Sequence, residues 1–210
     1  HLLTLGYVTF AFNHQGGNLF SQFFYLTQRG QEWARGTDPV PEDPKGYMAV
    51  LDQQAPRIDK VIRQYIQEAV SSYDRGNNFA SAVMLGAASE KAVYLLMESL
   101  GKSVKDMQEK QAIQRVVRDE RSLEAMFDLL TRNLKRAKDP KIGAMPYKVS
   151  EGADEFLVAL MQAIRMQRNK AVHPAVAKVN QDQLRLLLSG FPSACRKICD
   201  LIRWLKVHQF

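Results

Sequence analysis

The sequence predicts a mainly α protein, in which a bundle of five to six helices follows a small N-terminal β-hairpin. A hydrophobic content of 46%, with 12 glycines and 8 prolines in 210 residues, is typical of a globular chain. Apolar residues alternate near the N-terminus but recur at spacings of three and four after residue 56. A proline-rich stretch separates the two patterns. We therefore expect a hairpin at 1–35, a linker at 36–55 and a helical bundle at 56–210.

The first 35 residues carry the hairpin pattern. Val8, Phe10 and Phe12 alternate with small or polar residues, and a turn containing Gly-Gly leads to the apolar run 23–26. The string Tyr-Leu-Thr-Gln-Arg-Gly at 25–30 resembles the last strand and exit of a winged-helix domain. The helices that precede the wing in such a domain are missing, so we expect a winged-helix-like remnant in a fragment of a longer protein. Three prolines in 36–46 predict an extended linker.

Helical periodicity begins after Pro56. A stripe from Ile58 to Tyr73 predicts the first helix of the bundle, which Gly76 ends. Asn77 or Asn78 caps the second helix, which runs to Gly101. Its predicted stripe consists of Phe79, Val83, Ala87, Glu90, Tyr94 and Met97. The segment 80–92 is rich in Ala, Ser and Gly, so we expect a neighbouring helix to approach it closely.

The remaining helices are marked by their breaks. The region 104–137 breaks near Arg121–Ser122, and a loop with two prolines and a glycine follows at 138–150. Ser150 is predicted to cap a helix over 151–172. The last region, 181–207, is expected to be interrupted at Gly190-Phe191-Pro192.

Charge is distributed unevenly along the chain. The net charge is +7, yet residues 1–55 contain three basic and five acidic side chains, against 26 basic and 17 acidic in the remainder. The basic excess peaks at Arg132, Lys135, Arg136, Lys138, Lys141 and Lys148. Such a cluster predicts either a nucleic-acid partner or a solvated basic face, and charge alone favours neither.

Other compositional features exclude several classes. No apolar run approaches the roughly 20 residues of a membrane span, so we expect no membrane partner. Cys195 and Cys199 lie one helical turn apart and predict two reduced core thiols in a cytoplasmic protein. They lack the spaced partners of a zinc site, and no carboxylate cluster has metal-ligand spacing. We therefore expect no metal and no cofactor.

The run Arg-Asn-Lys-Ala-Val-His at 168–173 ends the helix predicted over 151–172. The apolar stripe of this helix, Phe156, Leu157, Leu160 and Ile164, leads four residues later to Arg168. Pro174 disfavours helical geometry at His173, so the helix should end near Val172, leaving His173 able to turn toward Arg168. A guanidinium beside an imidazole can hold a phosphate and move a proton.

An all-α domain with Arg, four residues and then His at the end of a helix resembles the HEPN superfamily. Arg168, Asn169 and His173 match its Arg-polar-x3-His motif, and the Ala-Ser-Glu-Lys-Ala helix at 88–92 is similar to bacterial HEPN-like domains. The resemblance covers roughly 56–207. It implies metal-independent ribonuclease activity at a composite site between two protomers. It also implies a homodimer or a pair with a related HEPN partner, and a role in toxin–antitoxin or antiviral defence systems.

Each predicted site residue has a chemical role. His173 would exchange the proton of the RNA 2′-OH, and Arg168 would stabilise the phosphate charge. Asn169 would orient either the imidazole of His173 or the phosphate. Lys170 and the basic cluster would bind the RNA backbone. Two alternatives stay open. Glu90 either aims Arg168 or forms a purely structural ion pair with it, and the domain is either a nuclease or a non-catalytic module for nucleotide binding or assembly.

Overall fold

The computed structural model describes residues 8–11, 23–26, 39–118, 123–151, 153, 156–173 and 179–210. These residues are mainly helical, which confirms the predicted class; they contain eight helices rather than five to six. In chain order the elements are β1 (Val8–Ala11), β2 (Phe23–Leu26), α2 (Pro44–Gln54), α3 (Lys60–Asp74), α4 (Asn78–Ser103), α5 (Met107–Arg118), α6 (Leu123–Lys138), α7 (Tyr147–Ser150), α8 (Phe156–Val172) and α9 (Gln181–Val207).

Strands β1 and β2 pair antiparallel, with Val8 opposite Leu26 and Ala11 opposite Phe23. The backbone therefore has a two-stranded sheet in the region where alternation of apolar residues predicts one. The winged-helix resemblance rests largely on residues 27–30, which lie outside the described residues.

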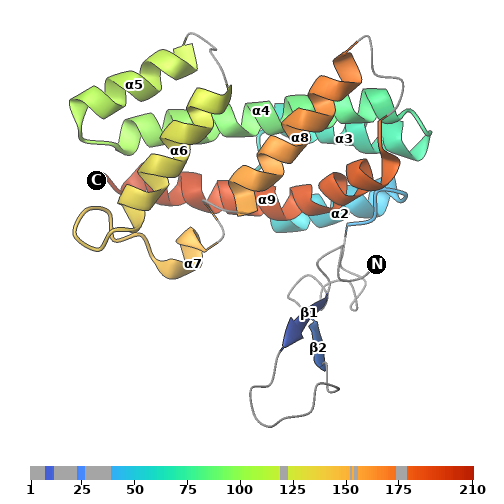
Figure 1. Ribbon diagram of the computed structural model, residues 1–210, viewed down its shortest axis with the longest axis horizontal. Helices are drawn as coiled ribbons and strands as arrows, with labels where there is room; N and C mark the ends of the chain where they lie inside the picture. The colour runs from blue at the N-terminus through green and yellow to red at the C-terminus, as the bar shows by residue number, and fades with distance from the viewer. Residues whose placement is uncertain are drawn as a thin grey trace.

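Helix α4 is the centre of the bundle. It contacts α3, α5, α6, α8 and α9, and α6 and α8 lie across it (Figure 1). Being covered from several sides, α4 buries more than one stripe. The predicted stripe was wrong in part, because Met97 is buried whereas Phe79 is 41% exposed and Glu90 half-buried. By length and composition α4 could also cross a membrane, but its contacts are those of a core helix.

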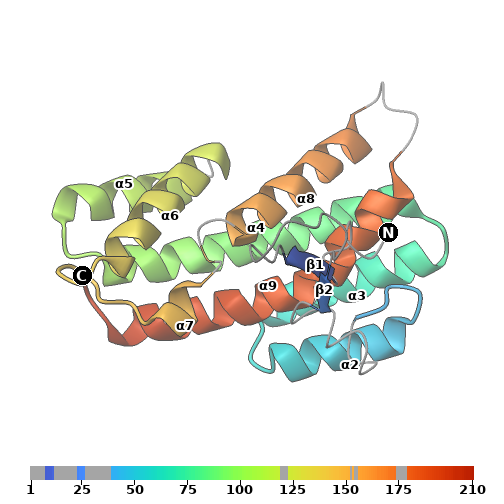
Figure 2. The same ribbon diagram turned by 60° about the horizontal axis from the view of Figure 1, so that its bottom comes forward.

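Helix α2 corrects the predicted linker. Asp43 caps it by accepting a hydrogen bond from the Gly46 N–H at 3.1 Å, and Pro44 occupies the first turn, where proline is tolerated. Tyr47 and Leu51 are fully buried, since α2 packs on α3 and α9 (Figure 2). The segment 44–54 is thus part of the bundle and not of a linker.

Helix α9 is continuous through Pro192, so the predicted interruption at 190–192 was wrong. A proline inside a helix leaves the carbonyl four residues earlier without its usual N–H donor. That carbonyl belongs to Leu188, and the buried Tyr47 hydroxyl of α2 donates to it at 2.7 Å. A residue 141 positions away in sequence therefore satisfies the group that the proline leaves unpaired, and the helix continues.

The region before α8 differs from the prediction. Ser150 ends the short helix α7, and its hydroxyl donates to the Tyr147 carbonyl at 3.2 Å. It therefore does not cap α8, which begins at Phe156 rather than 151. The predicted break near 121–122 lies outside the described residues, but α5 ends at Arg118 and α6 begins at Leu123, so two helices are present as expected.

Close packing of α8 on α4 depends on Gly86. A Cβ atom built at residue 86 would lie 2.6 Å from the Cβ atom of Arg168, too close to be accommodated without moving α8. The hydroxyl of Ser89 contacts the Met161 sulfur at 2.8 Å along the same seam. The small residues of 80–92 therefore do allow the close approach that the sequence predicts.

We expect Gly86→Ala to lower the free energy of unfolding by up to about 2 kcal/mol. Alanine adds up to about 1 kcal/mol of helix propensity, but overpacking costs about 1–3 kcal/mol. The matched control is Gly190→Ala in α9, whose Cβ would meet a Leu160 methyl at an ordinary 3.5 Å. That variant should be neutral or more stable in urea unfolding. Equal changes in the free energy of unfolding for the two substitutions would show that the contact between residues 86 and 168 does not limit how closely α8 packs on α4.

Candidate functional site

The motif lies at the exposed C-terminal end of α8. The helix ends at Val172, as predicted, and His173 follows it with an exposed side chain. The His173 backbone N–H donates to the Lys170 carbonyl at 3.3 Å, which closes the last turn. Lys170 and Asn169 are exposed as well. All four predicted motif residues, Arg168 included, therefore lie within the last turn and a half of one helix and its exit.

Arg168 lies at the edge of the buried face of α8. That face runs through Leu157, Met161, Ile164 and Gln167, so the apolar stripe does not lead directly onto Arg168. The aliphatic part of Arg168 packs over Gly86 of α4. A long cationic side chain can pack its methylene groups on a neighbour while its charged end stays in water.

The guanidinium of Arg168 is held by two acceptors. Its Nη2 atom lies 3.4 Å from Glu90 Oε1, and Nη1 donates to Asn169 Oδ1 at 3.2 Å. Gly86 and Glu90 are one turn apart on α4, so the same helix face receives both the stem and the charged end of Arg168. The predicted pairing with Glu90 is confirmed.

The Arg168–Glu90 pair is only partly buried. The exposed fractions of the two side chains are 37% and 24%. Ion pairs with this much solvent contact contribute about 0.2–1 kcal/mol, which is small beside the cost of breaking a buried pair. A guanidinium carries five N–H donors, so acceptors at Glu90 and Asn169 leave donors for a phosphate.

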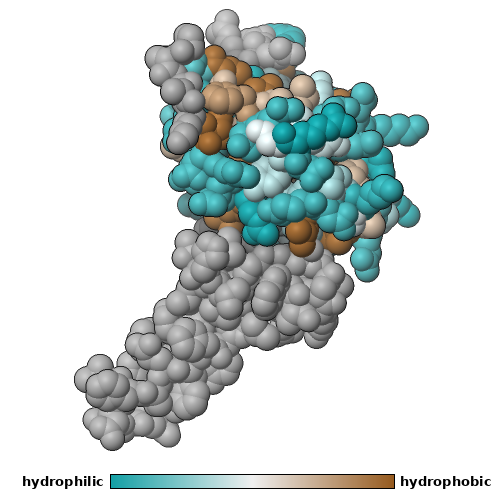
Figure 3. Space-filling view, turned by 90° about the vertical axis from the view of Figure 1, so that its right-hand side faces the viewer, coloured by the Kyte–Doolittle hydropathy of each residue, from teal (hydrophilic) through white to brown (hydrophobic). Residues whose placement is uncertain are grey.

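An exposed stripe follows α8 to the motif. Its exposed members, at spacings of three and four, are Ala159, Gln162, Met166, Asn169 and His173. The Met166 side chain is 60% exposed, and Val172 beside the stripe is 56% exposed. Figure 3 looks onto this end of the bundle, where a mostly hydrophilic face has apolar side chains gathered near its top. Met166 and Val172 are therefore two exposed apolar side chains close to the polar motif residues.

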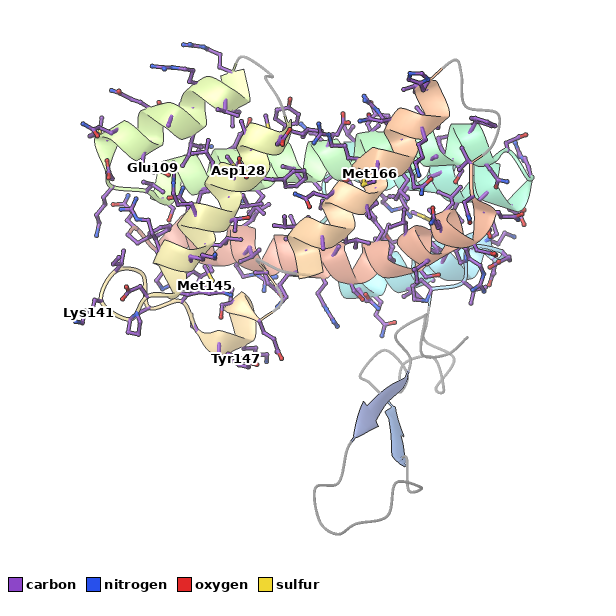
Figure 4. All side chains as sticks on the ribbon, viewed as in Figure 1. Glu109, Asp128, Lys141, Met145, Tyr147 and Met166 are labelled. Atoms are coloured by element: carbon purple, nitrogen blue, oxygen red, sulfur yellow. The ribbon has the colours of Figure 1, made fainter. Side chains whose placement is uncertain are left out.

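The basic cluster lies far from the motif. Arg132, Lys135, Arg136 and Lys138 are on α6, and Lys141 follows in the loop before α7, at the end of the bundle opposite the exit of α8 (Figures 1 and 4). Within one protomer the structure therefore does not bring the predicted phosphate-binding cations next to Arg168 and His173. Lys170 is the predicted RNA-binding cation that lies beside them.

Two arginines of the basic cluster are already paired. Arg132 donates from Nε and Nη2 to Glu109 of α5 at 3.0 and 2.8 Å, and Arg136 lies 3.9 Å from Asp106. The Asn133 amide donates to the same Glu109 carboxylate at 2.6 Å. These contacts join α5 to α6, and they leave the exposed Lys135, Lys141 and Lys148 as the more available cations of the cluster.

Two positions that support the site were not predicted. Gly86 receives Arg168, and the buried Gln167 donates to Gln183 of α9 at 2.5 Å, which fixes the motif turn against the first turn of α9. The small-residue segment 80–92 was the available signal for Gly86. A polar residue at a stripe position was the available signal for Gln167.

The described residues contain no group of three or more His, Cys, Asp and Glu side chains arranged to hold a metal ion. Cys195 and Cys199 are on α9, and burial raises the pKa of both thiols above the ordinary value. Comparison of the chain with protein-family models, curated proteins and solved structures found no match.

Proposed function

We propose that this protein is a metal-independent endoribonuclease of the HEPN type, acting in the cytoplasm as a toxin or antiviral effector. The observation that carries the proposal is the Arg168 guanidinium, held by Glu90 and Asn169 five residues before the exposed His173. Phosphodiester cleavage through a neighbouring hydroxyl requires a cation that holds the phosphate and a group that exchanges protons, and Arg168 and His173 supply these two groups within the last turn and exit of α8.

The reaction proceeds by transfer within the RNA. One imidazole removes the proton of the 2′-OH, the 2′-oxygen attacks the adjacent phosphorus, and the bond to the 5′-oxygen breaks. A second imidazole supplies a proton to the departing 5′-oxygen. Arg168 stabilises the negative charge that builds up on the phosphate oxygens. The products are a 2′,3′-cyclic phosphate and a 5′-hydroxyl, and no metal takes part.

The second imidazole comes from a second protomer, either another copy or a related HEPN chain. The exposed stripe on α8 supports pairing at this helix. In an antiparallel pair centred on Met166, the two His173 positions would lie about 21 Å apart along the axes, at 1.5 Å per residue. This separation would keep the two motifs apart. We therefore infer a two-fold axis that either lies near the C-terminal end of α8 or runs parallel to this helix, because both arrangements bring the two motifs together.

We expect Met166→Glu to convert the dimer to a monomer and to reduce RNA cleavage with it, because the charge would be buried in the interface. The matched control is Met107→Glu on α5, since Met107 is 62% exposed against 60% for Met166. Sedimentation at micromolar concentration measures the assembly. A wild-type monomer that still cleaves RNA would contradict the composite site.

The alternative is a non-catalytic module for nucleic-acid binding or assembly. Its support is that Glu90 and Asn169 already hold Arg168, as in a structural link between α4 and α8, and that the basic cluster lies away from the motif. Incubation of the purified protein with total RNA, with its natural partner present, distinguishes the ribonuclease from the non-catalytic module. We expect new 5′-hydroxyl ends; binding without cleavage would favour the module.

A further inference from the structure

A hollow of about 440 Å³ lies between the start of α3 and the second halves of α4 and α9. No residue of α8 lines it. The volume falls in the range of about 300–1,000 Å³ that is usual for small-molecule sites. The hollow is therefore large enough for a ligand and separate from the proposed ribonuclease site.

The floor of the hollow is aliphatic. Ile62, Leu95 and Ile198 line it, together with the thiols of Cys195 and Cys199. Burial raises the pKa of both thiols, so they are neutral at neutral pH and behave as small apolar groups. No aromatic side chain is among the lining residues that the structure describes. Such a floor fits an alkyl chain and offers no ring on which a nucleobase could stack.

The rim of the hollow is cationic. Arg57, Lys102, Arg203 and Lys206 stand against two carboxylates, Asp59 and Glu98. Asp59 is occupied as the cap of α3, where it accepts hydrogen bonds from two backbone N–H groups at 2.9 and 3.3 Å.

Three of the rim cations have no ion-pair partner among the described residues. Arg203 pairs with Asp200 at 3.1 Å, whereas Arg57, Lys102 and Lys206 have no carboxylate partner in the described part of the chain. A rim on which cations outnumber carboxylates, over an apolar floor, attracts a ligand with a negative head and an apolar body.

We propose that this hollow binds an anionic amphiphile with a single alkyl chain, the chemistry of a fatty-acid carboxylate. The chain lies on the floor formed by α3, α4 and α9, and the anionic head lies at Lys102 and Lys206. This site is independent of RNA cleavage. Accordingly, His173→Ala should bind the ligand as the unchanged protein does.

Titration calorimetry with dodecanoate, below its micelle concentration, tests the proposal. We expect saturable binding with one site per chain. Dodecan-1-ol, which has the chain without the charge, and butyrate, which has the charge without most of the chain, should each bind at least tenfold more weakly. Dodecyl phosphate should bind comparably, because it shares the chemistry. Equal binding of dodecan-1-ol and dodecanoate would overturn the role of the rim.

Two variants locate the site. The double substitution Lys102→Glu with Lys206→Glu should raise the dissociation constant for dodecanoate at least tenfold. The matched control, Lys45→Glu with Lys105→Glu, changes two exposed lysines outside the hollow and should leave it unchanged. Leu95→Trp, which fills the floor, should abolish binding. Unchanged affinity in both pocket variants would contradict the proposal.

Protection of a thiol gives an independent readout. Cys195 and Cys199 are the two cysteines of the chain; Cys195 is buried and Cys199 half-buried. Dodecanoate should slow the alkylation of Cys199 by iodoacetamide at alkaline pH at least fivefold, as followed by intact mass. Alkylation at an unchanged rate under saturating dodecanoate would place the ligand elsewhere.

Discussion

His173→Ala is expected to lower the rate of RNA cleavage by about 100- to 10,000-fold, the range for removal of a general acid or base. RNA affinity should change little, because an imidazole contributes proton transfer rather than fixed charge. The fold should also be unaffected, since His173 is exposed and lies beyond the end of α8. Single-turnover cleavage of a labelled RNA measures the first effect, and filter binding measures the second.

The control for this variant is His208→Ala. His208 is also exposed and lies beyond the end of α9. Its ring stacks on that of Trp204, with 4.6 Å between the ring centroids, and it has no role in the proposed reaction. Its cleavage rate should stay within about threefold of the unchanged protein, well below the smallest effect expected for a catalytic group. If His173→Ala cleaves as fast as His208→Ala, the imidazole of His173 has no role in the chemistry.

Arg168→Ala is expected to lower cleavage by about 100- to 1,000-fold, as for loss of a group that stabilises transition-state charge. Arg168→Lys should recover stability better than activity. The lysine stem still packs over Gly86 and its ammonium can still face Glu90, but it lacks the planar fork that contacts two phosphate oxygens. Parallel measurement of cleavage rates and urea unfolding separates the two effects.

Glu90→Gln distinguishes aiming from structural support. The pair is partly exposed, so its loss should change the free energy of unfolding by no more than about 1 kcal/mol. If Glu90 aims the guanidinium, cleavage should fall well beyond what this small loss of stability explains. Full activity in Glu90→Gln would leave Glu90 a purely structural partner, and full activity in Arg168→Lys would show that the charge alone suffices.

Local patterns predicted the C-terminal end of the motif helix but not its start at Phe156. Pro174 predicted that α8 ends at Val172. The Arg168–Glu90 pair could be predicted because a cation lies near the apolar stripe of one helix and a carboxylate lies on the stripe of another. Helix α2 could also have been predicted, because Asp43 followed by Pro44 is a helix-start signal. The surrounding prolines led instead to the prediction of a linker.

Contacts between distant residues account for what the sequence did not predict. Pro192 does not interrupt α9 because Tyr47, in another helix, supplies the missing donor to Leu188. The spacing of charges along α6 also could not show that Arg132 would pair with Glu109 of α5. Nor could it show that this pair would lie at the end of the bundle opposite the exit of α8. Both results depend on tertiary packing, which no local pattern of residues determines.

The most direct test of the proposed ribonuclease uses one RNA oligonucleotide and its copy with a single 2′-deoxy nucleotide at the cleaved position, both in excess EDTA. We predict that the unmodified RNA is cut to a 2′,3′-cyclic phosphate and a 5′-hydroxyl, and that the 2′-deoxy copy resists, because the 2′-oxygen is the nucleophile. Equal cutting of both oligonucleotides, or loss of cutting in EDTA, would contradict this account.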